Sequence, residues 1–185
     1  MNVVFMGTPD FAVPSLENIA KVHFVQAVFT QPDKPVGRKM ILTPPDVKVC
    51  AEKLGIPVYQ PVKLKDSDSY EIIKELNPDV IVVVAYGQIL PENILNIPKY
   101  GCINVHGSLL PKYRGAAPIQ WSVLNGDKVT GVTTMYMEKG LDTGDMISKI
   151  VIPISPTETG GSLFGKLAQA GADLLIKTLP SIEQG

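Results

Sequence analysis

The chain has 185 residues, of which 45% are hydrophobic and only 19% are charged. It is therefore long enough to enclose a sizeable core and too apolar to be intrinsically disordered. Its 17 basic residues are balanced by 18 acidic ones, which gives a formal net charge of −1. This balance excludes a strong overall attraction to nucleic acid, so any such contact has to come from a local basic patch.

Cysteine and histidine are scarce in this sequence. Cys50 and Cys102 form no Cys-x-x-Cys pair and His23 lies far from His106, so we expect no metal site. A disulfide between the two cysteines is conceivable, but sparse cysteine favours a reducing compartment. The amino-terminal segment lacks the basic stretch of a signal peptide, and the apolar run 80–85 is too short to cross a membrane. We expect a cytoplasmic protein that does not enter a membrane.

Strand and helix patterns alternate along the first 106 residues. Apolar segments, many of them β-branched, predict strands over 2–6, 24–29, 58–59, 79–85 and 102–106. Patterns bounded by proline and glycine predict helices over 14–21, 45–54 and 69–76. The longest expected loop covers 31–45 and contains four prolines. Such alternation indicates a parallel sheet with helices on both faces.

The pattern changes in the last third of the chain. Segments 131–137 and 146–154 read as strands separated by too few residues for a crossover helix, so they should pair antiparallel. Apolar residues near helical spacing then predict a closing helix over 162–179. The predicted fold class is α/β, with a Rossmann-like, mostly parallel sheet, helices on both faces and an antiparallel addition near the carboxyl terminus.

Asn104 and His106 give the strongest local signal of function. Strand alternation places both side chains on one face, at the carboxyl end of a strand, where open α/β sheets bind ligands. An amide and an imidazole that point together into a cleft suit oxyanion stabilisation and acid–base catalysis. A pair of half-buried polar side chains without a catalytic role explains the spacing about equally well.

Two other segments carry weaker signals. The glycine-flanked segment 140–145 is ordinarily just a turn, but a catalytic imidazole such as His106 often has a carboxylate partner, and Asp142 is a candidate. Ser108 raises the possibility of a serine hydrolase, which the lack of a Gly-x-Ser-x-Gly motif disfavours.

The turn at 7–12 follows the first strand, where a dinucleotide-binding fingerprint would stand. It has only the first glycine of that fingerprint, and Pro9 lacks an amide hydrogen for a phosphate. We therefore expect no nicotinamide cofactor, and a tight strand-to-helix turn is the simpler interpretation.

Several separated segments resemble the formyltransferase family that uses 10-formyltetrahydrofolate. They are Asn-Val-His-Gly-Ser-Leu-Leu-Pro at 104–111, Lys-Tyr-Arg-Gly-Ala-Ala-Pro at 112–118, Gly-Val-Thr-Thr at 131–134 and Gly-Leu-Asp-Thr-Gly-Asp at 140–145. Segments 7–12, 29–33 and 85–91 most resemble the branch of this family that formylates methionyl-tRNA. The resemblance runs over essentially the whole chain, with its motifs in the order typical of the family.

The resemblance implies a role for individual positions. It implies a catalytic triad of Asn104, His106 and Asp142. It implies folate contacts by Ser108, Leu109, Leu110 and Pro111, and by Gln88, Ile89 and Leu90, the last three largely through backbone groups. It implies contacts to the acceptor stem of tRNA by Lys34, Arg38 and Lys39. It implies no metal.

The implied activity transfers the formyl group of 10-formyltetrahydrofolate to the amino group of initiator methionyl-tRNA, for translation initiation. We expect a monomeric catalytic domain over 1–180, with 181–185 starting a linker to a second domain, and weak tRNA binding without that domain. Two alternatives stay open. The acceptor could be a small amine, glycinamide ribonucleotide or an amino-sugar nucleotide, or the chain could bind folate or tRNA without turnover.

Overall fold

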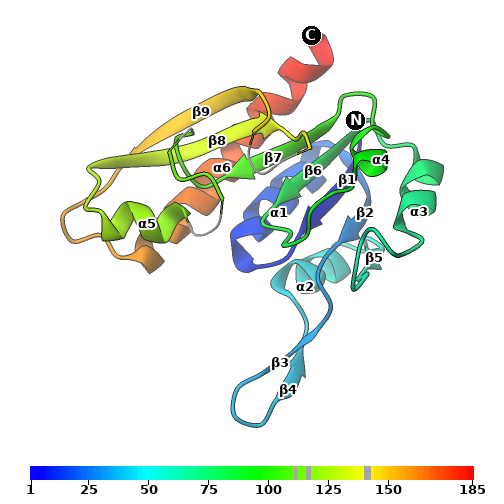
Figure 1. The fold of residues 1–185 in the computed structure, drawn as a ribbon, viewed down its shortest axis with the longest axis horizontal. Coiled ribbons are helices and arrows are strands. Elements are labelled where there is room, and N and C mark those ends of the chain that lie inside the picture. The colour runs from blue at the N-terminus through cyan, green and yellow to red at the C-terminus, as the bar shows by residue number, and fades with distance from the viewer. Residues whose placement is uncertain (111, 116–117, 140–142) are drawn as a thin grey trace.

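A seven-stranded sheet forms the centre of the molecule (Figure 1). The computed structural model describes residues 1–110, 112–115, 118–139 and 143–185. The strands, in their order across the sheet, are β5 (Val58–Tyr59), β2 (Phe24–Phe29), β1 (Asn2–Gly7), β6 (Val80–Val84), β7 (Cys102–His106), β8 (Val129–Tyr136) and β9 (Met146–Pro153). The five strands from β5 to β7 pair in parallel, whereas β8 pairs antiparallel with both β7 and β9. The predicted fold class is confirmed.

Helices cover both faces of this sheet. They are α1 (Val13–Val22), α2 (Asp46–Lys53), α3 (Ser69–Leu76), α4 (Glu92–Leu95), α5 (Pro118–Leu124) and α6 (Gly160–Gln184), with a short 3-10 turn at Asp10–Ala12 before α1. Helices α1, α2 and α6 pack on one face, and α3 and α4 on the other. No helix within the described ranges is both long enough and apolar enough to cross a membrane.

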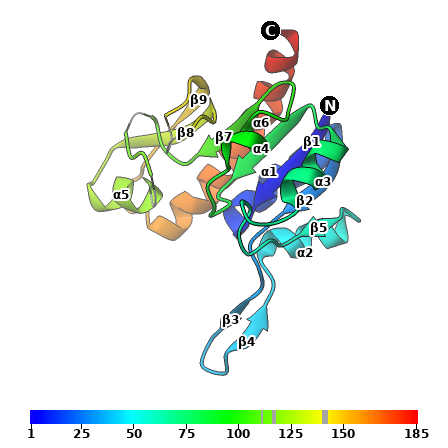
Figure 2. The same cartoon turned by 45° about the vertical axis from the view of Figure 1, so that its right-hand side comes forward.

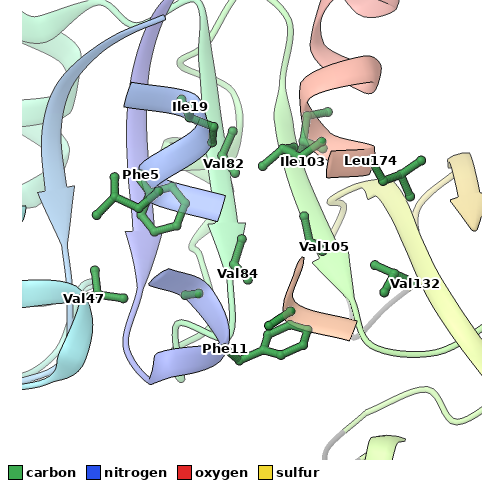
Figure 3. Close-up of a cluster of buried hydrophobic side chains, with 14 of the residues drawn as sticks. Phe5, Phe11, Ile19, Val47, Val82, Val84, Ile103, Val105, Val132 and Leu174 are labelled. Carbon is green, nitrogen blue, oxygen red and sulfur yellow. The ribbon is translucent and has the colours of Figure 1, made fainter. Parts of the chain in front are cut away.

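Strand β6 is the centre of the core because it is buried on both faces. Val82 and Val84 point to the same side as Val105 of β7, where they meet α1 and α6 (Figure 3). Ile81 and Val83 alternate to the opposite side and pack against α3 and α4. A continuous β-branched run is what a strand enclosed on both sides requires. This rigid centre holds the carboxyl ends of β1, β6 and β7 at one edge.

The longest predicted loop contains a hairpin. Strands β3 (Lys34–Val36) and β4 (Ile41–Thr43) pair antiparallel, and the hairpin projects away from the sheet in both overall views (Figures 1 and 2). Every residue from 34 to 44 is exposed. Because neither strand packs on the core, neither shows the alternation of apolar and polar residues by which strands are recognised in sequence.

Two helices were missed in the sequence and one proved longer than predicted. Helices α4 and α5 are too short to display a helical period. Helix α6 begins at a capping box, in which Thr159 and Ser162 bond each other's backbone amides, and it continues past Pro180 to Gln184. Ile182 keeps the apolar face of α6 in contact with the core beyond that proline. Whether 181–185 leads into a linker stays a prediction.

Candidate active site

A cavity of about 610 Å³ opens at the carboxyl ends of β1, β6 and β7. Its walls are mostly apolar and come from segments far apart in the sequence. The apolar residues that line it include Phe11, Val83, Leu90, Leu95, Ile119, Met135, Met137 and Phe164. A concave, apolar site with a few polar groups, at the carboxyl edge of a parallel sheet, is the usual place for a ligand in this fold class.

Asn104 and His106 both line this cavity. They lie on one face of β7, with Asn104 opposite Met135 and His106 opposite Thr133 in the register with β8. Asn104 is half-buried, and only 7% of His106 is exposed. The predicted shared placement of these two side chains is observed, whereas their catalytic roles stay a prediction.

The imidazole of His106 is oriented by the loop that follows β7. Its Nε2 lies 2.8 Å from the carbonyl oxygen of Tyr113. A carbonyl oxygen only accepts hydrogen bonds, so this contact is a hydrogen bond in the tautomer that carries its proton on Nε2. The backbone of Tyr113 has φ +57°, in the left-handed region that few non-glycine residues adopt. The tyrosine hydroxyl is fixed as well, because it donates to Oδ2 of Asp127 at 2.7 Å.

In the same loop, Gly107 lines the cavity, whereas residues 108–110 are tied to β8 and do not line it. The Ser108 hydroxyl donates to the carbonyl of Lys112 at 2.6 Å. Thr133 donates from Oγ1 to the Ser108 carbonyl at 2.7 Å and accepts from the Leu110 amide at 3.2 Å. None of the three predicted folate-contacting residues described here, Ser108, Leu109 and Leu110, is a lining residue of the cavity. Pro111, the fourth, lies outside the described residues.

The other predicted folate-contacting segment does border the cavity. Gln88, Ile89 and Leu90 all line it, after a backbone turn in which Ala85 has φ +49° and Gly87 has φ +94°. The side chain of Gln88 is occupied elsewhere, because its Oε1 accepts from the amide of Leu64 at 2.7 Å. With this side chain engaged, the main chain is what Gln88 has left to offer a ligand, and the predicted folate contacts of 88–90 stay a prediction.

The third member of the predicted triad, Asp142, lies in the part of the chain that the structure does not describe. Glu138 and Thr143, on either side of that gap, line the cavity. The predicted tRNA-contacting residues lie elsewhere: Lys34 begins β3, and Arg38 and Lys39 form the tip of the hairpin. Among the residues with assigned positions, no three His, Cys, Asp or Glu side chains gather as a metal site.

Apart from Ile89 and Leu90, sequence reasoning missed the apolar residues that shape the site. Phe11 meets Phe164 edge to face, with ring centroids 5.3 Å apart, and Ile119 packs beside Gly107. Met135 could have been placed at the site only by predicting that β8 pairs with β7, and in which register. That register sets Met135 opposite Asn104. Phe11, Ile119 and Phe164 reach the site from helical segments. No local sequence pattern shows that these segments lie close to β7.

Fold and site together define an α/β protein with a cavity at the carboxyl edge of a parallel sheet, lined by an amide–imidazole pair. The profile of the formyl transferase family matches residues 1–179. The chain belongs to this family.

Curated relatives and solved structures agree with that assignment. The methionyl-tRNA formyltransferase of Pelotomaculum thermopropionicum is 59% identical over 186 aligned residues, which cover 100% of this chain and 59% of the relative. That of Macrococcus caseolyticus is 56% identical over 183 residues, covering 99% and 59%. The chain thus spans about 59% of the length of these relatives.

The fold is also that of a solved protein, the phosphoribosylglycinamide formyltransferase of Streptococcus pneumoniae. The two structures superpose with a TM-score of 0.79 at 22% identity, over 98% of this chain and 97% of the other. At that level of identity the similarity concerns the fold alone.

Proposed function

We propose that this chain is the catalytic part of an enzyme that transfers the formyl group of 10-formyltetrahydrofolate to the amino group of methionyl-tRNA, for translation initiation. The observation that carries the proposal is the meeting of Asn104 and His106 at the cavity. The names of the relatives that share more than half of its residues support the acceptor.

The cavity suits the pterin ring system of a folate. A flat heteroaromatic ring needs apolar faces above and below it and hydrogen-bonding groups along its edge. Met135, Met137 and Leu95 offer adaptable apolar surface, and the turn at 87–90 offers main-chain groups. When bound there, the folate supplies an activated formyl group.

Asn104 and His106 divide the chemistry between them in this proposal. As the amine attacks the formyl carbon, negative charge builds on the formyl oxygen, and the Asn104 amide can donate to it. The bond between the formyl carbon and the folate nitrogen then breaks, so the attacking amine has to lose a proton and the folate nitrogen has to gain one. His106, at the same edge, is the group that can move it, with Asp142 as the carboxylate partner that the resemblance implies.

The β3–β4 hairpin is the proposed contact to tRNA. Lys34, Arg38 and Lys39 lie on an exposed projection, so they can reach phosphates that the body of a protein with net charge −1 would not attract. The tRNA affinity of this chain alone should be weak and should fall further as salt is added.

Formyl transfer from 10-formyltetrahydrofolate to methionyl-tRNA tests the proposal. We would compare this 185-residue chain, a longer version that carries the second, carboxyl-terminal domain implied by the resemblance, and the longer version with His106→Ala. The proposal is supported if the longer chain transfers the formyl group and His106→Ala lowers the rate of transfer at least about 10²-fold. Formylation of glycinamide ribonucleotide or an amino-sugar nucleotide instead would overturn the acceptor. Folate binding without any transfer would indicate a binding module.

We also propose that the chain acts as a monomer in the cytoplasm, where translation initiates, and that 1–180 forms the catalytic domain. Size-exclusion chromatography with light scattering tests the first point, since a dimer would double the 20.0 kDa mass of this chain.

A further inference from the structure

A chain of hydrogen bonds begins at the turn that borders the cavity. Gln88 Nε2 donates to Oε1 of Gln31 at 2.9 Å and to the carbonyl of Pro61 at 3.1 Å. The side chain of Gln31 also lies directly against Gly87, since a Cβ built on that glycine would stand 2.8 Å from Gln31 Nε2. Gln31 does not line the cavity, yet it is the direct support of the turn that does.

The backbone of Gln31 ties the same turn at a second point. Its amide donates to Oγ1 of Thr8 at 3.3 Å, and that hydroxyl donates to the carbonyl of Tyr86 at 2.7 Å. Its carbonyl accepts from Nε2 of Gln60 at 3.2 Å. The segment from Tyr86 to Gln88 is thus held by Gln31 both through its side chain and through its main chain.

The network continues to the base of the hairpin. Gln60 Nε2 also donates to Oδ1 of Asp33 at 2.7 Å. Lys48 of α2 pairs with the same Asp33 oxygen at 3.1 Å. The bonds from Gln60 and Lys48 hold the pKa of the Asp33 carboxyl below its ordinary value, so it stays charged at neutral pH. Asp33 immediately precedes Lys34, the first residue of β3.

We propose that this network couples the β3–β4 hairpin to the cavity edge, with Gln31 and Asp33 as positioning residues for ligands that they do not touch. The inference rests on the proposed function, in which the edge binds the folate and the hairpin binds the tRNA.

Two features of the backbone make such coupling effective. Ala85 and Gly87 both have positive φ, which is costly for alanine and persists only when neighbouring bonds hold it. The hairpin, for its part, is exposed from 34 to 44, and Asp33 is the residue that anchors it at its base. A ligand that fixes the hairpin therefore also fixes Asp33, Gln31 and the turn, and each ligand lowers the cost of binding the other.

The first test measures folate affinity without turnover. With the longer version of the chain and 5-formyltetrahydrofolate as the probe, Gln31→Ala should raise Kd about 3- to 10-fold, the effect of one or two neutral hydrogen bonds. Gln31→Glu keeps the acceptor for Gln88 Nε2 and should bring Kd back towards that of the wild type.

Gln26→Ala is the matched control for this test. Gln26 lies on β2, the strand that ends two residues before Gln31, and its Nε2 donates to the carbonyl of Leu76 at 2.9 Å, away from the cavity. It should leave the folate Kd unchanged. The inference is wrong if Gln31→Ala binds the probe as the wild type does, or if Gln26→Ala weakens binding equally.

The second test measures the coupling itself. The folate Kd is determined with and without saturating uncharged initiator tRNA. In the wild type, tRNA should tighten folate binding by about 3-fold or more. In Asp33→Ala, the ratio of the folate Kd without tRNA to the folate Kd with tRNA should approach one. If Asp33→Ala misfolds, Lys48→Met should give the same result. An equal ratio in wild type and variants overturns the coupling and leaves the proposed function standing. A wild-type chain that binds no folate at all refutes both.

Discussion

Tyr113 holds the imidazole of His106 in place through its carbonyl oxygen, which accepts from Nε2 at 2.8 Å. The same tyrosine is anchored at its other end, because its hydroxyl donates to Asp127 at 2.7 Å and accepts from the Asn125 amide at 2.8 Å. The orientation of the imidazole therefore depends on a loop whose own position is fixed by residues beyond α5.

This geometry predicts the tautomer of His106. Because a carbonyl oxygen faces Nε2, the neutral ring should carry its proton there. Imidazole ¹⁵N shifts from NMR distinguish the two tautomers. The chain has two histidines, so a His23→Gln variant assigns the remaining signal to His106. A neutral ring protonated mainly on Nδ1 would show that the contact with Tyr113 is absent in solution.

Tyr113→Phe should raise the pKa of Asp127. That pKa is lowered from its ordinary 3.8, first by the hydrogen bond from Tyr113 and then by the bond from Lys112. Removing the hydrogen bond from Tyr113, the larger of the two causes, should return the pKa of the Asp127 carboxyl towards 3.8. A ¹³C NMR titration of Asp127 measures this change.

The same change has a consequence for stability at low pH. A carboxyl whose pKa is lowered on folding stabilises the fold above its unfolded pKa, and this contribution is lost as the pH falls through the folded pKa. The urea midpoints of the wild type and Tyr113→Phe should therefore differ at about pH 6 and approach each other near about pH 3. A constant difference across this range would mean that Asp127 does not respond to the tyrosine hydroxyl.

Asn104→Ala should lower turnover and leave donor binding nearly intact. If the amide donates only to charge that develops during the reaction, its loss should reduce kcat about 10²- to 10³-fold. The measurement pairs initial rates of the longer chain with the Kd of 5-formyltetrahydrofolate. A variant that loses affinity in proportion to its rate would place Asn104 in ground-state binding instead.

Gly144→Ala should unfold more easily than the wild type. A Cβ at this position would stand 1.7 Å from the carbonyl oxygen of Tyr136, so the backbone at Gly144 would have to move away from the end of β8. We expect a loss of about 1–3 kcal/mol in the free energy of unfolding, measured by urea denaturation.

Gly165→Ala serves as the comparison for that variant. Gly165 lies inside α6, and apart from its chain neighbours and the backbone of the adjacent helical turns, no described atom lies within 4 Å of a Cβ built on it. The change should stabilise the chain by about 0.5–1 kcal/mol, since alanine loses less backbone entropy in a helix. A Gly144→Ala variant as stable as Gly165→Ala would contradict the close approach to Tyr136.

Local sequence patterns predicted much of the fold. The run from Val80 to Val84 was recognisable as a buried strand because five consecutive apolar, β-branched residues suit enclosure on both faces. The antiparallel pairing of β8 and β9 followed from the short distance between them along the chain. The hairpin at 34–43 escaped prediction because exposed strands show no apolar alternation, and α4 because its four residues complete barely one turn.

The sequence by itself determined that Asn104 and His106 share one face at the end of a strand, since alternation along a strand is a local property. Only the tertiary structure decided what surrounds them. Tyr113 against His106, and Gln31 against Gln88 across 57 residues of chain, are contacts between segments brought together by packing of the sheet and its helices. Hydrogen bonds of this kind depend on distances and angles that no residue type encodes, so they appear only once the chain has folded.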